Sequence, residues 1–89
     1  MIYGDAIEQA KQGKKIAREG WNGKGHFSFY MPPMDLAPEQ VNERTRQFVP
    51  AGPLHVDGYL AMWTTTGTLQ PGWIASQADT LADDWIVVP

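Results

Sequence analysis

The fold is decided in residues 14–31, KKIAREGWNGKGHFSFYM, where two strand-like runs flank a glycine-rich loop. Residues 14–19 predict a short strand around Ile16. Residues 26–31 predict a second strand, because Phe27, Phe29 and Met31 alternate with more polar neighbours and share one face. Asn22-Gly23 between the two runs favours a hairpin, since both residues tolerate positive φ. The stretch therefore predicts two antiparallel strands that turn at Asn22-Gly23.

A helix is predicted before this hairpin, over residues 4–12. Tyr3, Ala6, Ile7 and Ala10 fall at i, i+3, i+4 and i+7, which is one apolar stripe of a helix. Acidic residues stand in its first turn and lysines at or after its last turn, which suits the helix dipole. Gly13 fits the position just beyond the helix end, where positive φ is common.

The chain after the hairpin predicts further strands and one short helix. Residues 57–68 alternate in the manner of a strand, Pro71-Gly72 forms a turn, and residues 73–75 predict a brief strand. Ser76 is a good N-cap for a helix that ends by Asp84, and residues 85–88 predict a last strand.

Residues 34–56 give the weakest signal. Pro38 can open a short helix that carries Val41, Thr45 and Phe48, or the segment is a long ordered loop. The pattern leaves both alternatives open. The predicted fold class is α+β: a small antiparallel sheet with one N-terminal helix and a short C-terminal helix.

Composition indicates one folded domain over residues 1–89. Apolar residues make up 43% of the chain and charged residues 19%, which fits a globular protein. Four Trp, three Tyr and three Phe are more aromatic surface than so small a core can cover, so we expect a homo-oligomer. The first residues lack the basic and apolar segments of a signal peptide, and no apolar run approaches the ~20 residues of a membrane span. We therefore expect neither secretion by that route nor membrane insertion.

Charge and cysteine content exclude several function classes. A net charge of −3 argues against general affinity for duplex nucleic acid, which needs a basic face. The chain has no cysteine, which rules out a disulfide scaffold, a thiolate zinc site and a cysteine nucleophile, and which suits a reducing cytoplasm.

The loop Gly20–Gly25 is the first candidate binding element. An indole beside a tight turn, here Trp21, can stack on a nucleobase for ~1–3 kcal/mol. Glycine amides, together with Arg18 and Lys24, can contact a phosphate. The alternative is that Trp21 packs in the core, Asn22-Gly23 only turns the chain and Lys24 is solvated. Spacing alone favours this alternative.

Residues 76–79 are the second candidate. Side chains of the Ser, Gln and Asp types at a helix start can hold ribose hydroxyls, although an ordinary helix cap explains them more simply. Catalysis has little support, because neither Ser76 nor His26 nor His55 stands in a nucleophile motif. His55 and Asp57 are a weaker match to a metal pair than to a solvated loop. We expect no enzyme activity, no cofactor and no metal.

Two ordered motifs resemble a known family. Residues 1–18 with the Gly20–Gly25 loop, followed by residues 73–85 (WIASQADTLADDW), resemble the small phage and prophage domain associated with Thoeris anti-defence. The resemblance takes in residues 1–30 and 57–88, whereas residues 31–56 do not match.

The resemblance implies a non-enzymatic sponge. Members of this family capture the cyclic ADP-ribose isomers that bacterial TIR-domain enzymes make on infection, so that the downstream effector stays inactive. They form homo-oligomers, with a tetramer expected here, and bind ligand where subunits meet. Related sponges also take cyclic dinucleotides, which implies a possible second ligand class. The expected location is the cytoplasm of the infected bacterial host.

The resemblance also assigns roles to residues. Trp21 stacks on the base at an exposed hairpin tip beside a neighbouring chain, and Trp73 walls or supports the pocket. Polar or phosphate contacts fall to Asn22, Gly23, Lys24 and Gly25, and contacts to sugar hydroxyls fall to Ser76, Gln77 and Asp79.

Two other functions stay open. The first is a structural or protein-interaction module of a phage that binds no nucleotide and uses its aromatic residues only for interfaces. The second is a nucleotide hydrolase, which would need a metal or a base that the sequence does not offer.

Overall fold

The computed structural model describes residues 1–21 and 25–89. The expected turn at Asn22-Gly23 and the expected contacts of Asn22, Gly23 and Lys24 therefore lie outside the described residues. No helix in the described part of the chain is both long and apolar enough to cross a bilayer.

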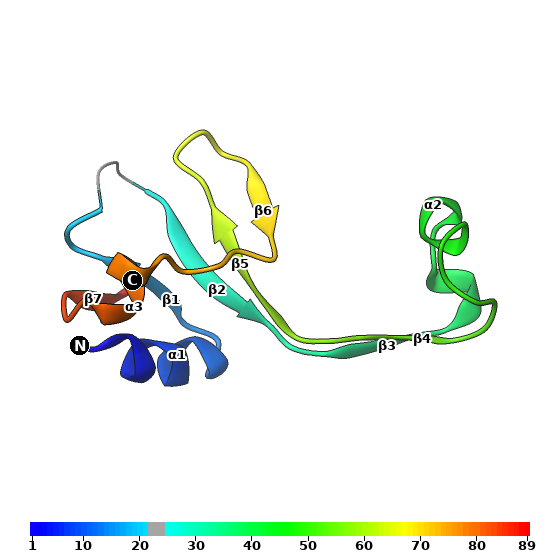
Figure 1. Cartoon of the computed structure of the whole chain (residues 1–89), viewed down its shortest axis with the longest axis horizontal. Coiled ribbons are helices and arrows are strands. Elements are labelled where there is room, and N and C mark those ends of the chain that lie inside the picture. Colours follow the sequence, from blue (N-terminus) through cyan, green and yellow to red (C-terminus); the bar gives the residue numbers. More distant parts are fainter. Residues whose placement is uncertain (22–24) are drawn as a thin grey trace.

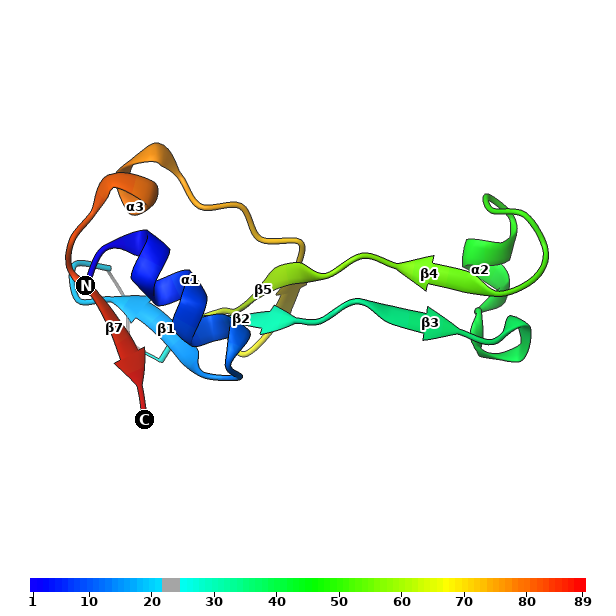
Figure 2. The ribbon, with the colours of Figure 1, turned by 90° about the horizontal axis from the view of Figure 1, so that it is seen from below.

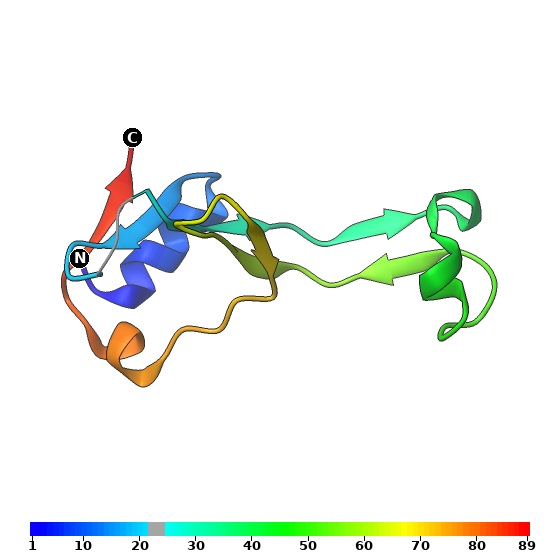
Figure 3. The ribbon, with the colours of Figure 1, turned by 90° about the horizontal axis from the view of Figure 1, so that it is seen from above.

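A five-stranded antiparallel sheet forms the body of the molecule (Figure 1). Helix α1 (Tyr3–Lys11) lies over one face of it, as the opposite views in Figures 2 and 3, from below and from above, show. The short helix α3 (Gln77–Leu81) lies in the chain between the last two strands of the sheet and contacts α1. This architecture confirms the predicted α+β class. The strands, in spatial order, are β6 (Leu69–Pro71), β5 (Tyr59–Trp63), β2 (Phe27–Met31), β1 (Lys15–Arg18) and β7 (Trp85–Val88).

The core is small and lies between α1 and the sheet. Ala6 and Ala10 of α1 are buried against Ile16 and Trp85, so the predicted apolar stripe is confirmed. Small alanine side chains let the helix approach closely enough for the Trp85 indole to fill the remaining space. Gly13 has φ +92° and donates its N–H to the Ala10 carbonyl at 2.9 Å, which ends the helix as predicted.

Strands β1 and β2 are antiparallel neighbours, as predicted, but they part early. Their ladder has one pair, Ile16↔Ser28, and the connection runs over residues 19–26 rather than two residues. Strand β1 pairs with β7 along its whole length, and the chain stays beside β7 after β1 ends, since the Glu19 N–H donates to the Asp84 carbonyl at 3.1 Å. This divergence places Trp21 and His26, one from each end of the connection, side by side.

Residues 32–58 form an arm that neither predicted alternative describes. Strands β3 (Met34–Leu36) and β4 (Leu54–Val56) pair with each other and carry the chain away from the body (Figures 1 and 2). The molecule consequently measures 44 × 26 × 25 Å. The tip holds a 3-10 turn, η1 (Pro38–Gln40), and one helical turn, α2 (Glu43–Arg46), so the predicted single helix is wrong. The Arg46 guanidinium ties the tip together by donating to the carbonyls of Pro50 and Gly52.

The predicted strand over 57–68 is also wrong at its end. It stops at Trp63, and residues 64–68 turn the chain back into β6. Threonine favours extended backbone, so this run imitates a strand, but Gly67 has φ +78° and breaks the alternation. Residues 73–75 are not a strand, which corrects the brief strand predicted there, although the Trp73 N–H still donates to the Leu60 carbonyl of β5 at 2.8 Å.

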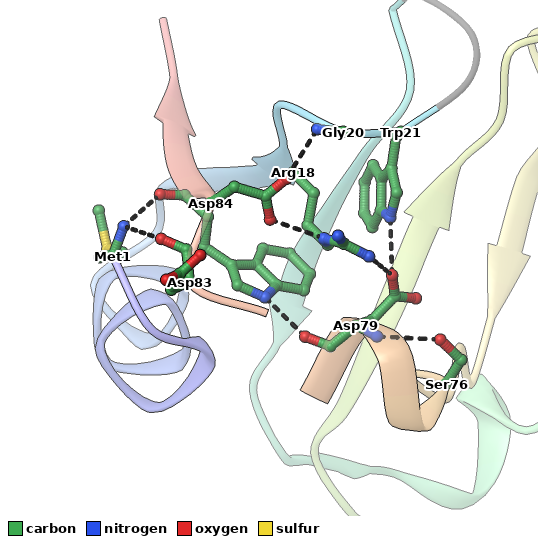
Figure 4. Close-up of polar contacts among 9 residues, drawn as sticks. Met1, Arg18, Gly20, Trp21, Ser76, Asp79, Asp83 and Asp84 are labelled. Carbon is green, nitrogen blue, oxygen red and sulfur yellow. Dashed lines mark hydrogen bonds and ion pairs between the residues drawn. The ribbon is translucent and has the colours of Figure 1, made fainter. Parts of the chain in front are cut away.

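The C-terminal elements follow the prediction. The Asp79 N–H donates to the Ser76 hydroxyl at 3.0 Å, so Ser76 caps α3 as predicted, and β7 occupies residues 85–88. Met1 joins this region, because its amino group donates to the Trp85 carbonyl at 2.7 Å and to the Asp83 carbonyl at 3.2 Å (Figure 4).

Candidate functional site

Trp21 is surrounded by other aromatic rings. Its indole stacks on His26, with ring centres 4.6 Å apart and planes 21° from parallel. Trp73 and Trp85 meet it edge-on at 5.9 and 5.3 Å. Trp21 is half-buried and packs against the core, which corrects the expectation of an exposed indole at the hairpin tip. Edge-on aromatic contacts stabilise such a ring, so one chain already holds Trp21 in place.

Asp79 is the polar centre of the site (Figure 4). Its Oδ1 accepts from Trp21 Nε1 at 2.9 Å and from Arg18 Nη1 at 2.8 Å. The backbone carbonyl of Asp79 accepts from Trp85 Nε1 at 2.8 Å. Burial alone would raise the pKa of this carboxyl, but the hydrogen bonds from Trp21 and Arg18 outweigh it and lower the pKa. Asp79 is therefore ionised and fixed in orientation.

Arg18 connects Asp79 to a second carboxylate, Asp84. Its Nε donates to Asp84 Oδ1 at 2.8 Å while Nη1 is engaged by Asp79. The hydrogen bond from Arg18 lowers the pKa of Asp84, and the two carboxylates raise the pKa of Arg18. The two acids engage Nε and Nη1 of this guanidinium, so the chain itself fixes its orientation, and the expected contact of Arg18 with a phosphate stays a prediction. We interpret Arg18 as a positioning residue for Asp79.

Gly20 permits the same network to close. Its backbone N–H donates to Asp84 Oδ2 at 2.8 Å, and a Cβ built at this position would lie 2.8 Å from that oxygen. Only glycine allows the backbone to approach the carboxylate this closely.

A cavity of about 310 Å³ opens beside Trp21. It lies on the sheet face that α1 covers elsewhere, because Met62 pairs with Ser28 and Ser28 pairs with the buried Ile16. Its volume is at the lower end of the range for small-molecule sites. Its wall combines the apolar side chains of two tryptophans and a methionine with the polar groups of a histidine, two threonines and an aspartate. The lining residues are Trp21, His26, Trp73, Met62, Thr64, Thr65 and Asp79.

A second concavity, of about 440 Å³, lies on the far side of the Trp21–His26 stack. Ala17, Ile86 and Val88 contribute apolar surface to it, and Lys15 stands at its margin with Nζ 4.9 Å from the Phe27 ring centre. The stacked rings therefore form a wall shared by two hollows.

The structure brings together most of the residues that the sequence singled out. Trp21, Trp73 and Asp79 line the first cavity, Arg18 and Ser76 hold Asp79 from outside it, and Gly25 borders the second concavity. Gln77 is exposed and lines neither hollow.

Four lining residues were missed: His26, Met62, Thr64 and Thr65. His26 gave a usable signal, since it follows the Trp21 loop closely, but its stacking depends on how the two strands part. The two threonines gave no signal, because the alternation over residues 57–68 predicted a continuous strand and not a turn beside the cavity.

Comparison with known proteins places the chain in context. Residues 1–88 match the family model described as a Thoeris anti-defense 2-like domain. Thoeris anti-defense 2 of Bacillus phage SP01 is 34% identical over 95 aligned residues, which cover 99% of this chain and 94% of that protein. Both matches include residues 31–56, for which the sequence motifs alone showed no resemblance.

Proposed function

The chain belongs to the Thoeris anti-defense 2-like family, and we propose that it counters Thoeris immunity by binding a cyclic ADP-ribose signal and holding it unchanged. The family assignment and the phage relative support the anti-defence role. The cavity beside Trp21 is the observation that carries the ligand part of the proposal.

The cavity offers what such a ligand needs at its base and sugar. Trp21 and Trp73 stand nearly perpendicular, at 79°, and form an apolar corner against which an adenine ring packs. Asp79 Oδ1 is already engaged, whereas Oδ2 accepts no hydrogen bond from the described residues. An ionised oxygen fixed at the edge of an aromatic pocket is a strong acceptor for ribose hydroxyls.

The state of Asp79 favours capture over conversion. Its lowered pKa keeps it ionised near neutral pH, so it is not a general acid, and the same lowering makes it a weak general base. Accepting hydrogen bonds is therefore the role that suits it best. Its orientation is set before ligand arrives by Trp21, Arg18 and the Ser76 cap. A preformed site avoids the cost of ordering, which suits the nanomolar affinity, about −12 kcal/mol, that a competitor of the natural receptor requires.

We propose that the working form is a homo-oligomer, with a tetramer expected, in the cytoplasm of the infected host. The arm supports this assembly, because its two-stranded ribbon has one apolar and one polar face. The pair Met34 and Val56 lies on the apolar face, and the pair Asp35 and His55 lies on the polar face. A two-stranded ribbon is marginally stable alone, so a second copy that covers the apolar face would stabilise it.

For the second concavity we propose a cyclic dinucleotide as ligand, because Lys15 supplies a cation there beside apolar surface.

The test is to incubate the protein with the product of a Thoeris TIR enzyme, remove unbound nucleotide, denature the protein and identify what it releases. Release of intact ligand supports capture, and release of an altered nucleotide indicates an enzyme. If nothing is taken up, the proposal is wrong and the interaction module becomes the better description. Trp73→Ala is the matched variant: it removes one cavity wall, and we expect uptake to fall while Ile74→Ala, at a residue that is 87% exposed, leaves it unchanged.

A further inference from the structure

The threonine turn, residues 64–68 between β5 and β6, borders the cavity through Thr64 and Thr65, and Asp79 of α3 lines the same cavity. Its ends are joined, since the Thr64 N–H donates to the Thr68 carbonyl at 2.9 Å and the Gly67 N–H donates to the Thr64 carbonyl at 3.1 Å. Gly67 has positive φ, and no described residue other than glycine does. These features define a type I turn followed by a glycine bulge, which is a rigid hairpin connection.

Thr65 differs from the other threonines of the turn. Thr64 Oγ1 lies 2.6 Å from Thr68 Oγ1 and 3.1 Å from Thr66 Oγ1, so these three hydroxyls satisfy one another. The Thr65 hydroxyl and the Thr65 backbone N–H have no partner among the described residues. Of the two threonines that line the cavity, Thr65 is thus the one whose hydroxyl and backbone N–H are not used by other described residues.

The charges around the cavity make such donors significant. A diphosphate brings negative charge, while the carboxylate of Asp79 is already at the cavity and the Arg18 guanidinium is neutralised by two acids. An anionic group is therefore best placed away from Asp79, against hydroxyl and amide donors. Backbone amides of a turn are an established means of holding an anion.

We propose that the threonine turn holds a phosphate of the bound nucleotide through the hydroxyl and the backbone N–H of Thr65. This inference rests on the proposed function, and it divides the cavity into two ends. Asp79 receives hydroxyl groups at one end, the aromatic corner receives the base, and Thr65 donates to phosphate at the other end.

The test measures the affinity of the full-length protein for a cyclic ADP-ribose isomer by calorimetry, with Thr65→Val, Thr65→Ser and Thr66→Val compared with the wild type. Valine has nearly the shape of threonine without the hydroxyl. Because hydrogen bonds to charged groups are the stronger ones, we expect Thr65→Val to weaken binding about tenfold or more. Thr65→Ser keeps the hydroxyl donor, so its affinity should lie within about twofold of that of the wild type. Thr66→Val is the matched control, since the Thr66 hydroxyl points into the threonine cluster and does not line the cavity.

A second readout needs no variant. The amide proton resonance of Thr65 should shift downfield when the wild type binds the nucleotide, as expected for a new hydrogen bond to phosphate. Wild-type binding without that shift, unchanged affinity of Thr65→Val, or an equal loss in Thr66→Val would each overturn the role of Thr65 and leave the proposed function intact. If the wild type binds no cyclic nucleotide, both proposals fail together.

Discussion

The indole N–H of Trp21 donates to Oδ1 of Asp79 at 2.9 Å, across 58 positions of sequence. This bond ties the loop after β1 to the first turn of α3, and Arg18 donates to the same oxygen. One carboxylate oxygen thus holds the two motifs by which the sequence resembles its family. The family motifs meet at Asp79, so we expect the stability of the fold and the proposed nucleotide binding to be coupled at this residue.

Replacing Asp79 by Asn tests this coupling. The amide keeps the shape but turns one acceptor into a donor and removes the charge that Arg18 faces, while the side chain is only 15% exposed. We expect a loss of about 1–3 kcal/mol in the free energy of unfolding, together with loss of nucleotide uptake. Urea denaturation measures the first and ligand release the second. Asp83→Asn is the control, because Asp83 is exposed and only its backbone carbonyl takes part in the network. Equal stability of the two variants would contradict the central place given to Asp79.

Gly20→Ala tests the close approach to Asp84. The new Cβ would lie 2.8 Å from Asp84 Oδ2, which accepts from the Gly20 N–H, while Arg18 holds Oδ1 of the same carboxylate, so the carboxylate must move. We expect destabilisation of about 1–2 kcal/mol, typical of a forced shift in a packed site. Gly4→Ala is the matched control: it lies in α1 with open space around its Cβ position, and alanine there should stabilise the helix by up to about 1 kcal/mol. Thermal unfolding of both variants shows whether the signs are opposite, as we expect.

Local patterns account for the parts of the fold that the sequence predicted. Helix α1 was predictable because its buried alanines recur at helical spacing. The start of α3 was predictable because the Ser76 hydroxyl accepts a hydrogen bond from the backbone N–H three residues later. Neither depends on any distant strand. The Gly13 helix end is of the same kind.

The arm and the cavity depend on pairings between distant residues, and for that reason they escaped prediction. Each arm strand has three residues, too few for periodicity, and it is the pairing of Met34 with Val56 that makes them a ribbon. Thr65 reaches the cavity only because β5 lies beside β2 and carries the turn to the side of His26. The two ion pairs of Arg18 escaped prediction because both acidic partners come from the far end of the chain.

His55 makes the stability of the arm depend on pH. Its Nδ1 lies 2.8 Å from Asp35 and its Nε2 lies 3.4 Å from Asp57, and the hydrogen bond to Asp35 is the main reason that the pKa of His55 is raised above 6.5. A raised pKa in the folded state means that protonated His55 stabilises the arm fully below the pKa of the unfolded chain. That contribution is lost as the pH rises through the folded pKa. We expect the melting temperature to fall between pH 6 and 8, and His55→Asn to flatten that part of the profile. A profile that His55→Asn leaves unchanged would show that the arm's carboxylates do not act on this residue.

Met34→Glu tests the apolar face of the arm as the contact between copies. Met34 is 40% exposed, so a single chain tolerates a carboxylate there, whereas a partner packed on this face would have to bury the charge. We expect the mass measured by light scattering to fall from that of the oligomer to that of the monomer, without loss of α1 helicity. Gln40→Glu adds the same charge at the arm's tip, away from the apolar face, and should leave the mass unchanged, since a carboxylate can still accept from the Ala37 N–H as Gln40 does. A monomeric wild type would refute the homo-oligomer itself, and an oligomer that survives Met34→Glu would move the contact to another surface. The body offers one, because Leu69 and Trp63 are exposed and paired with each other at the β6 edge of the sheet.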